Sequence, residues 1–445
     1  MRERLLKPFR AKGGVRVPHH KNTANLQSVV MPPPKQVVIP MLQHIGAPCK
    51  PTVKAGDKVL VGQVIGDTEA YMAAPVHASV SGTVKEITSI LMPSGAPVEA
   101  VVIESDGRME KADCAPPDVG TKENFLKAVR ASGLVGLGGA GFPAHVKLNV
   151  PPDKEVDTLI VNAAECEPYI TSDHREILEN SWSVLSGVYA VKELLGIQRV
   201  IIAIENNKPD AIQLLSEIAG KEYDPKNEVR VMALKSVYPQ GAEKILIRSC
   251  TGRKVPPGKL PADVGCIVMN VTSVAFLAQY LKTGLPLVSK RITVDGSAVQ
   301  NPQNVIVPIG TSVSDVIGFC GGYKETPKKI LYGGPMMGTA LSDDRFPVLK
   351  QNNAVLAFGE KEAKLKEPSA CIRCGCCMYV CPMNLLPVSL AQASEAKDMD
   401  KLEKYRVMTC IECGCCSYVC PANRHILQAI RLGKQYYKEH GKAGK

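Results

Sequence analysis

Cysteine is the residue type whose spacing points most directly to chemistry in this chain. Of its 16 cysteines, ten lie in two twelve-residue segments, 371–382 and 410–421, which are identical at ten positions and offset by 39 residues. Each segment reads Cys-x2-Cys-x2-Cys-x3-Cys-Pro, a spacing at which three thiolates of one short loop reach three corners of a cubane. The duplication therefore predicts two [4Fe–4S] clusters.

The fourth cysteine of each segment is expected to cross to the other cluster, as it does in two-cluster ferredoxins. One cluster then takes Cys371, Cys374, Cys377 and Cys420, and the other takes Cys381, Cys410, Cys413 and Cys416. Cys376 and Cys415 fall out of register and are not assigned as ligands. Two zinc sites are the alternative, because Cys-x2-Cys pairs also bind zinc. Zinc is disfavoured because each segment adds a third and a fourth cysteine at iron–sulfur spacing.

A glycine-rich segment could bind a flat or phosphorylated ligand. Gly136, Gly138, Gly139 and Gly141 lie directly before Phe142 and contain the pattern Gly-x-Gly-x-x-Gly. In dinucleotide-binding proteins this pattern follows a strand and opens a helix, whereas here it follows a predicted helix and meets a proline. An ordinary dinucleotide turn is excluded, but exposed backbone N–H groups could still cradle a ligand. Lys147 could offer a charge to phosphate, and an ordinary loop is the alternative.

Two carboxylates follow a predicted buried strand. Glu165 and Glu167 come just after an apolar run that includes Asn162. Acidic residues at the carboxyl end of a strand lie where open α/β sheets bind ligands, so they could accept hydrogen bonds from ribose hydroxyls or an amide. A solvated loop is the alternative. Cys166, between the two carboxylates, is interpreted as a small buried residue.

The elements that must position these residues differ along the chain. Residues 36–115 alternate short β-branched runs with turns, which predicts a small all-β unit similar to a lipoyl- or biotinyl-type barrel-sandwich hybrid. No lysine stands at its hairpin tip, residues 69–72, so no covalent cofactor is expected. Residues 116–284 alternate helix patterns with buried strands, the βαβ signature of an α/β domain. Residues 346–445 predict a helical two-cluster module, because the spacer between the cysteine segments is rich in helix formers and 426–440 has a helical pattern.

Composition and charge narrow the class of protein. The 445 residues carry a net charge of +11, with 45% hydrophobic and 22% charged residues, as in ordinary globular chains. Residues 1–21 carry +6 and residues 421–445 carry +5, so the middle is neutral. A nucleic-acid-binding protein would more often show a basic stripe on its body, so no nucleic-acid partner is expected. Basic ends suit an anionic membrane face or an acidic protein, and solvated tails are the alternative.

The sequence has neither of the apolar segments that direct a chain into or across a membrane. No stretch of 18 or more residues is free of polar groups, so no spanning helix is expected. The basic N-terminus lacks the apolar run of a signal peptide. We therefore expect the chain to stay on the cytoplasmic side.

Motifs along nearly the whole chain resemble the C subunit of the Rnf electron-transport complex. They are GGVRVPHHK (13–21), GLGGAGFPAHVKL (136–148), VNAAECEPYI (161–170), YPQGAEKILI (238–247), MNVTSVAFLA (269–278) and GGPMMG (333–338), together with the twin cysteine segments. The central part also resembles the flavoprotein subunit of complex I, whose GRGGAGFP loop and Glu-Pro turn bind FMN and NADH. Leu137 replaces the Arg of that loop, and Tyr169 replaces the Gly that follows Glu-Pro, so the pose of NADH is open.

The resemblance implies a ligand for each part of the central domain. FMN would be held by Gly136, Gly138, Gly139, Gly141, Lys147, Asn162 and Asn270. NADH would meet Glu165 and Glu167, and Phe142 would stack near the nicotinamide. No side chain is assigned as a catalytic acid or base, because hydride transfer requires none. Residues 285–345 resemble the SLBB β-grasp insert, for which we expect a packing or docking role.

The predicted organisation is therefore a multidomain chain of α/β, β and α parts. Its predicted parts are a basic extension (1–35), a barrel-sandwich-hybrid-like β domain (36–115), a Rossmann-like FMN/NADH α/β domain (116–284), an SLBB domain (285–345) and an α-helical ferredoxin-type domain with two [4Fe–4S] clusters (346–445). A flavin fits between NADH and the clusters because nicotinamide exchanges two electrons at once, whereas a cluster moves one.

The implied function is that of a peripheral Rnf subunit in a membrane-bound ferredoxin:NAD+ oxidoreductase that couples electron transfer to ion translocation. The implied partners are NADH, the other Rnf subunits, including membrane-embedded ones, and ferredoxin through the complex. The implied location is the cytoplasmic side of the cell membrane. Two alternatives stand beside it. One is a cobalamin reductase of bacterial microcompartments, which resembles Rnf C subunits over the same motifs, and the other is a non-enzymatic electron relay.

Overall fold

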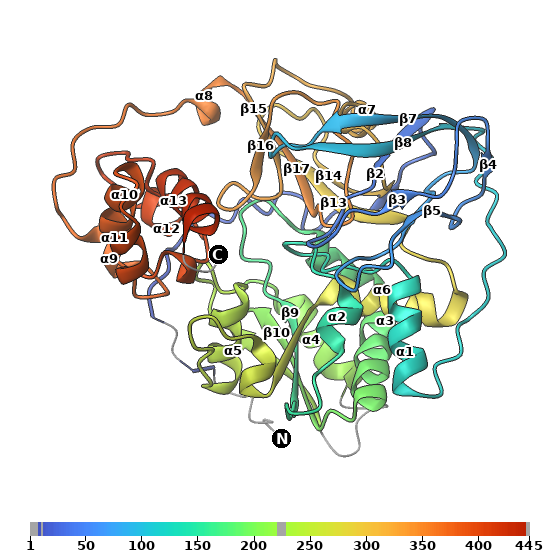
Figure 1. Ribbon diagram of the computed structural model, residues 1–445, viewed down its shortest axis with the longest axis horizontal. Coiled ribbons are helices and arrows are strands. Elements are labelled where there is room, and N and C mark those ends of the chain that lie inside the picture. Colours follow the sequence, from blue (N-terminus) through green and yellow to red (C-terminus); the bar gives the residue numbers. More distant parts are fainter. Residues whose placement is uncertain (1–7, 10–11, 220–227, 442–445) are drawn as a thin grey trace.

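The computed structural model describes residues 8–9, 12–219 and 228–441. Among the basic residues predicted at the chain ends, Arg2, Arg4, Lys7, Arg10, Lys442 and Lys445 lie outside these ranges. Three regions that contain β-sheets pack together, and a helical module lies to one side of them (Figure 1). No helix in the described ranges is long and apolar enough to cross a membrane.

The first region forms two small antiparallel sheets, as the barrel-sandwich prediction requires. Their orders are β2–β8–β7–β4 and β3–β5–β6. The strands are β2 (Gln36–Pro40), β3 (Lys50–Pro51), β4 (Lys58–Val59), β5 (Val64–Asp67), β6 (Val76–His77), β7 (Gly82–Leu91) and β8 (Pro97–Ser105). Val37 and Ile39 of β2 meet Val101 and Ile103 of β8 in one apolar core, because every second side chain of a strand points to the same face.

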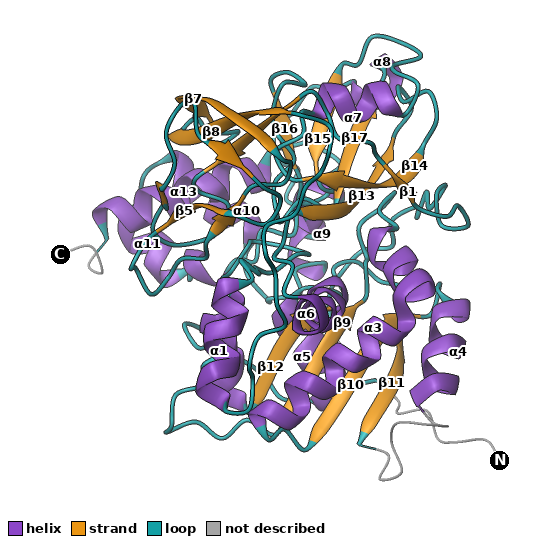
Figure 2. Ribbon diagram, turned by 90° about the vertical axis from the view of Figure 1, so that its right-hand side faces the viewer, coloured by secondary structure: helices purple, strands orange, loops and turns teal. Residues whose placement is uncertain are grey.

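The second region is an α/β domain around a parallel sheet of order β11–β10–β9–β12. The strands are β9 (Thr158–Ala163), β10 (Arg199–Glu205), β11 (Val229–Leu234) and β12 (Cys266–Asn270). The helices are α1 (Lys122–Ala131), α2 (Ala144–Leu148), α3 (Ser172–Leu195), α4 (Pro209–Ile218), α5 (Glu243–Thr251), the 3-10 turn η2 (Pro261–Val264) and α6 (Val271–Thr283). Figure 2 shows α1, α3 and α6 on the near face of the sheet and α5 behind it.

Burial on both faces explains why these strands read as unbroken apolar runs. Leu159 and Val161 of β9 face the core shared with Val184 of α3. Ile160 between them faces the opposite core, which contains Leu246 of α5. In chain order the sheet reads 3-2-1-4, so the direction of strand addition reverses between β9 and β12. Open α/β sheets bind ligands outside the carboxyl ends of the strands at such a switch point.

The third region is a mixed sheet of order β1–β14–β13–β17–β15–β16. The strands are β1 (Val29–Val30), β13 (Ser289–Asp295), β14 (Gln303–Pro308), β15 (Lys329–Tyr332), β16 (Thr339–Leu341) and β17 (Ala354–Phe358), with helix α7 (Val313–Phe319). The sheet extends beyond the segment 285–345 at both ends. β17 pairs with both β13 and β15, and β1, from the basic N-terminal extension, pairs with β14. Sequence patterns within one segment could not predict these pairings, because the paired strands lie far apart in the sequence.

The C-terminal module is helical, as predicted. Its elements are α8 (Glu360–Ala363), α9 (Cys376–Tyr379), α10 (Pro387–Glu395), α11 (Met399–Lys404), the 3-10 turn η3 (Val407–Thr409), α12 (Cys415–Tyr418) and α13 (Ile426–His440). The spacer between the cysteine segments forms two helices rather than one. Lys397 takes a left-handed φ of 51°, and Asp398 caps α11 by accepting from the Lys401 N–H at 3.0 Å.

Candidate functional site

The switch point of the parallel sheet places two predicted asparagines side by side. Asn162 of β9 and Asn270 of β12 are register partners at the carboxyl ends of neighbouring parallel strands. Asn270 also starts α6, where its Oδ1 accepts from the backbone N–H of Thr272 at 2.9 Å and of Ser273 at 3.3 Å. An N-cap of this kind fixes the side chain, so Asn270 is held at the switch point.

The glycine loop lies against Asn270. A Cβ atom at Gly138 would stand 2.5 Å from Asn270 Nδ2, so only glycine allows this approach. The Leu137 N–H donates to Ser273 Oγ at 3.2 Å, and Lys290 Nζ donates to the Leu137 carbonyl at 2.9 Å. Gly138 and Gly139 are exposed, so the loop turns accessible backbone outward beside the switch point. It follows α1 and precedes α2, which confirms that it is no ordinary dinucleotide turn.

The side chain of Glu165 reaches the start of α3. Its Oε1 accepts from the Asp173 N–H at 2.6 Å and its Oε2 from the His174 N–H at 3.3 Å. Asp173 in turn accepts from Asn270 Nδ2 at 2.8 Å, which links the acidic turn to the asparagine at the switch point. Carboxylates are stabilised at helix N-termini, yet burial still raises the pKa of Glu165.

Glu167 binds the loop between β15 and β16. Its carboxylate accepts from the N–H groups of Met336 at 3.0 Å and Met337 at 2.9 Å. A Cβ atom at Gly334 would lie 2.1 Å from Glu167 Oε2, so the glycine in the GGPMMG motif makes room for this carboxylate. Burial raises the pKa of Glu167 to about 7. The mixed sheet and the α/β domain therefore meet at this residue.

Lys21 from the N-terminal extension fastens the acidic turn. Its Nζ donates to the carbonyls of Glu165 and Glu167, each at 2.9 Å, and also to the carbonyl of Ile170. Burial lowers the pKa of Lys21. A solvated tail is therefore ruled out for this part of the extension, although sequence reasoning gave Lys21 no role. The only available signal was its place in the GGVRVPHHK motif.

Three predicted residues lie at the edge of this constellation. Lys147 Nζ binds Glu243 Oε2 at 2.9 Å and the Val268 carbonyl at 3.0 Å. Asn162 Nδ2 donates to the Gly241 carbonyl at 2.9 Å. Phe142 is half-buried, and its carbonyl accepts from the Gly136 N–H at 2.9 Å, which closes the glycine loop. Gly141 anchors the loop to the barrel-sandwich region, because its carbonyl accepts from the Ile45 N–H.

The backbone conformation at Tyr169 explains why glycine occupies this position in the flavoprotein subunit of complex I. Its backbone has a φ of 69°, in the left-handed region that favours glycine. The Tyr169 ring stacks on His20 with centroids 4.9 Å apart, and its N–H donates to the His19 carbonyl at 2.9 Å. Contacts with the N-terminal extension therefore support a tyrosine in this strained conformation.

The four cysteines assigned to the second cluster surround one cavity. Cys381, Cys410, Cys413 and Cys416 line it together with Cys415, which was not assigned as a ligand, and with apolar side chains that include Leu390 and Ile430. Burial, with help from the neighbouring thiols, raises the pKa of Cys416 to about 12. An apolar cavity lined by thiols suits a cationic iron core, which binds them as thiolates. The donor set therefore fits a [4Fe–4S] cluster, including the crossing of Cys381 from the first segment.

The two cysteine loops repeat the same backbone geometry. Arg373 and Glu412 have φ values of 56° and 57°, and each of their N–H groups donates at 3.4 Å to the first thiol of its loop. Cys377 and Cys420, from opposite loops, interact electrostatically, and burial raises the pKa of Cys377. In the described ranges no three His, Cys, Asp or Glu side chains converge on a single ion position. A cubane does not require this, because each iron takes one thiolate.

A tyrosine connects the acidic turn to the second cysteine loop. The Tyr238 hydroxyl donates to the Cys413 carbonyl at 2.8 Å and lies 3.5 Å from Glu167 Oε1. Cys415, in the same loop, is fully buried against this segment. Tyr238 opens the YPQGAEKILI motif, but nothing in the sequence indicates which residues it contacts. The candidate nucleotide site and one cluster site thus share a wall.

Comparison with known families finds a matching domain model in four parts of the chain. Residues 9–108 match the RnfC barrel sandwich hybrid domain, 129–279 the Nuo51 FMN-binding domain, 291–340 the SLBB domain and 363–421 the 4Fe-4S dicluster domain. The predicted fold class is confirmed by these matches.

Several curated proteins resemble the chain over nearly its whole length. The C subunit of the proton-translocating ferredoxin:NAD(+) oxidoreductase complex of Clostridium ljungdahlii is 44% identical over 434 residues, 96% of this chain and 93% of that protein. The C subunit of the Na(+)-translocating complex of Acetobacterium woodii is 44% identical over 95% of this chain and 96% of that protein. The corresponding protein of the ion-translocating oxidoreductase complex of Rhodobacter capsulatus is 37% identical over 96% of this chain and 83% of that protein.

Among solved structures, a chain of an NAD+-reducing [NiFe]-hydrogenase in the H2-reduced state is similar, with a TM-score of 0.48 and 18% identity. The likeness covers 72% of this chain and 61% of the hydrogenase chain. The family assignment rests instead on the curated relatives, which are 37% to 44% identical to this chain over 95% to 96% of its length. The chain therefore belongs to the RnfC family, the C subunits of ion-translocating ferredoxin:NAD+ oxidoreductase complexes, and it contains an FMN-binding domain and a 4Fe-4S dicluster domain.

Proposed function

We propose that this subunit exchanges electrons between NADH, FMN and two [4Fe–4S] clusters, and that the cluster of the second loop is the one next to the flavin. The observation that carries the proposal is the link from Glu167 through Tyr238 to the Cys413 carbonyl. Tyr238 donates to the Cys413 carbonyl and lies 3.5 Å from Glu167 Oε1, so a single side chain spans the distance between the nucleotide site and the cluster loop, which suits electron transfer. A scaffold that merely supported a relay would not need it.

The proposed FMN site lies above the carboxyl ends of β9 and β12. Its residues are Gly136, Gly138, Gly139, Gly141, Lys147, Asn162 and Asn270. When bound, FMN supplies the chemistry that neither other cofactor has, because it takes electrons in pairs from NADH and returns them singly. The chain's part is to position it through the exposed backbone of the glycine loop. Lys147 would reach a phosphate only if its ion pair with Glu243 opened.

The proposed NADH site adjoins the acidic turn, with Phe142 near the nicotinamide. Glu165 and Glu167 already accept N–H groups of their own chain. Their proposed role is therefore to hold the wall against which NADH lies, and any direct contact uses their remaining lone pairs. Neither carboxylate acts as an acid or base.

The proposed setting is supported by the similarity of this chain to C subunits of ion-translocating ferredoxin:NAD(+) oxidoreductase complexes. The subunit would sit on the cytoplasmic side of the cell membrane, bound to the membrane-embedded subunits of an Rnf complex. Electrons would reach ferredoxin through that complex, and the clusters of this chain would pass them on. No nucleic acid takes part in this proposal.

Anaerobic addition of NADH to the FMN-loaded subunit, followed by EPR, tests the proposal. We expect the flavin absorbance to bleach and cluster signals to appear. Changing both carboxylates, Glu165→Gln with Glu167→Gln, should weaken the apparent affinity for NADH while iron content and dithionite-reduced EPR signals stay unchanged. A wild-type subunit that retains no flavin, or clusters that NADH cannot reduce, would overturn the proposed function.

A further inference from the structure

The two cysteine loops have nearly the same sequence but different surroundings. In the second loop, Cys413 is 8% exposed and Cys415 is fully buried. Their counterparts in the first loop, Cys374 and Cys376, are both exposed. The duplication thus offers an internal comparison, in which one loop is covered by the chain itself and the other is open.

The cover of the second loop combines apolar side chains with hydrogen-bond donors from Tyr238 and from α13. Tyr238, Met336 and Val15 pack around it, and the Tyr238 hydroxyl donates to the Cys413 carbonyl. Glu412 at the third position of the loop binds Arg431 of α13 at 3.0 Å. These contacts shield the loop from water.

Within the described residues, 371–379 of the first loop have none of these contacts, and only Val380, at the end of the loop, packs against the same apolar cluster. Ile372 is 67% exposed and Tyr379 is 76% exposed, so large apolar groups face solvent beside a predicted cluster ligand. Arg373 stands where the second loop has Glu412, and it forms no ion pair with a described residue. Exposed apolar groups gathered in one place mark an interaction site.

The two loops differ at only two of twelve positions, and both differences match their surroundings. Glu412 and Ser417 of the second loop bind α13, since Ser417 Oγ accepts from the Leu427 N–H at 2.9 Å. The first loop has Arg373 and the exposed Met378 there. Arginine and methionine are enriched in protein interfaces. The residues that tie one loop to its own chain are thus replaced in the other by residues that suit a partner.

We propose that residues 371–379 form the docking surface for a partner subunit of the complex that carries its own redox group. The partner would present an apolar surface, a carboxylate opposite Arg373 and a hydrogen-bond donor for the Cys374 carbonyl, as Tyr238 provides for Cys413. The surface would bring that redox group next to the first cluster. This inference rests on the proposed function, because it takes the first loop to hold a cluster.

The decisive variant makes the first loop identical to the second, by Arg373→Glu with Met378→Ser. All twelve residues then occur in a loop that this chain already folds, so loss of the loop structure is not the expected effect. The matched control is Lys259→Glu with Leu260→Ser, which changes one exposed cation and one exposed apolar side chain at a distant position in the sequence. Each is coexpressed with the tagged complex, and the retained fraction of the subunit is measured by gel filtration.

We expect the loop variant to lose retention at least about tenfold and the control to match wild type. Both should keep their iron, their flavin and their NADH-reduced cluster signals. Retention of the loop variant at the wild-type level would overturn the docking proposal. Clusters that are absent or not reducible by NADH in the wild type would instead overturn the proposed function, so the two failures are distinct.

A second measurement does not depend on any variant. A water-soluble paramagnetic complex, chromium(III) oxalate, should speed the EPR relaxation of one dithionite-reduced cluster in the isolated subunit and lose this effect in the assembled complex. Equal relaxation in both states would show that no partner covers the exposed loop, and would overturn the proposal.

Discussion

Asn270 makes three separate interactions with one amide side chain. Its Oδ1 caps α6, its Nδ2 donates to Asp173, and the same nitrogen leaves room only for a glycine at position 138. A residue with these contacts ties the glycine loop, the strand end and the start of α3 together. Precision at a ligand site depends on such fixed side chains.

Asn270→Ala should therefore weaken FMN binding more than it lowers the free energy of unfolding. Loss of the N-cap costs about 1 kcal/mol, and we expect FMN affinity to fall by about tenfold or more because the glycine loop loses its support. The matched control is Ser312→Ala, which removes the N-cap of α7, where Ser312 accepts from the Asp315 N–H at 3.0 Å. Fluorescence titration of the apoprotein with FMN measures both. Equal FMN affinity in the two variants would contradict the assigned site.

Lys350 predicts a pH dependence of stability. It is 1% exposed, and its Nζ donates to the Pro75 carbonyl at 2.6 Å and the Gly133 carbonyl at 2.8 Å. Burial lowers the pKa of Lys350 from 10.5 to about 7. Between these values the unfolded chain binds more protons than the folded one, so this group makes stability rise with pH from about 7 to 10.5.

Lys350→Met should remove that rise. The variant is less stable throughout, because two buried carbonyls lose their donor, and its deficit relative to wild type should widen as the pH increases from neutral. Thermal unfolding followed by circular dichroism at several pH values provides the comparison. Parallel curves for the two proteins would show that Lys350 does not titrate in this range.

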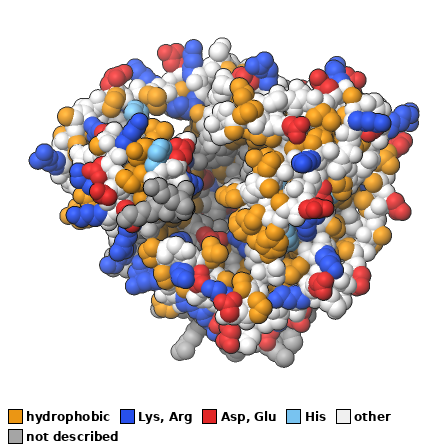
Figure 3. Space-filling view, viewed as in Figure 1, with side chains coloured by type: hydrophobic (Ala, Val, Ile, Leu, Met, Phe, Trp, Pro, Cys, Tyr) orange, Lys and Arg blue, Asp and Glu red, His pale blue; other side chains and the backbone are white. Residues whose placement is uncertain are grey.

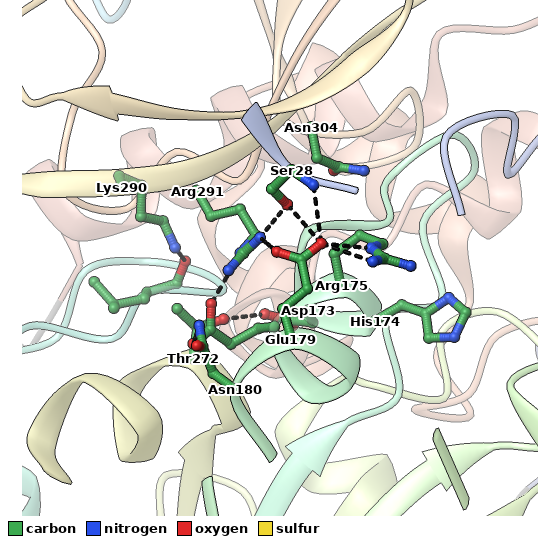
Figure 4. Close-up of polar contacts among 12 residues, drawn as sticks. Ser28, Asp173, His174, Arg175, Glu179, Asn180, Thr272, Lys290, Arg291 and Asn304 are labelled. Atoms are coloured by element: carbon green, nitrogen blue, oxygen red, sulfur yellow. Dashed lines mark hydrogen bonds and ion pairs between the residues drawn. The ribbon is translucent and has the colours of Figure 1, made fainter. Parts of the chain in front are cut away.

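At the scale of elements, a buried charge network fastens α3 to the mixed sheet. Figure 4 shows Arg291 of β13 pointing toward Glu179 and Ser28, with Arg175 beside the same carboxylate. Arg291 Nε also binds Glu176 at 2.9 Å, and both side chains are almost fully buried. Lys290, the neighbouring residue of β13, reaches the glycine loop. The strand therefore positions the candidate flavin site from a different domain.

Arg291→Met should destabilise the chain by about 3–5 kcal/mol, because it leaves buried carboxylates without their partner. The control is Arg345→Met, whose ion pair with Asp343 is exposed and should be worth less than about 1 kcal/mol. Urea unfolding compares the two. Similar losses in both variants would mean that the buried network does not join the elements.

At the scale of the molecule, the helical module stands beside the α/β domain with its second cysteine loop inward. Figure 3, which shows the side of the molecule seen in Figure 1, has Lys and Arg side chains gathered at the lower left, below the helical module. Because the second loop meets Tyr238 and the first faces solvent, the proposed route runs from the flavin to the inner cluster and then to the outer one.

This order predicts different outcomes for two ligand substitutions. Cys374→Ala should remove the outer cluster and leave the inner one reducible by NADH. Cys413→Ala should remove the inner cluster and stop NADH from reducing the outer one, although dithionite still reduces it. EPR of each variant after NADH and after dithionite provides the measurement. Reduction of the outer cluster by NADH in the Cys413 variant would reverse the proposed order.

Local patterns in the sequence determined much of this protein. The spacing of the ten clustered cysteines, the helix 426–440 and the buried strand ending near Asn162 were all predictable, because ligand spacing and hydrophobic period are properties of short segments. The glycine loop and the acidic turn were found in the same way. Their approach to one another was implied only by the resemblance to the Rnf and complex I subunits.

The tertiary structure decided which residues meet. Lys21 reaches Glu165 across 144 positions and Tyr238 reaches Cys413 across 175, and no local period records such contacts. It also decided that two nearly identical loops differ in burial, since burial depends on what packs against a loop rather than on the loop itself. Sequence alone thus predicted the cluster ligands, whereas packing decided which cysteine loop lies inward and which faces outward.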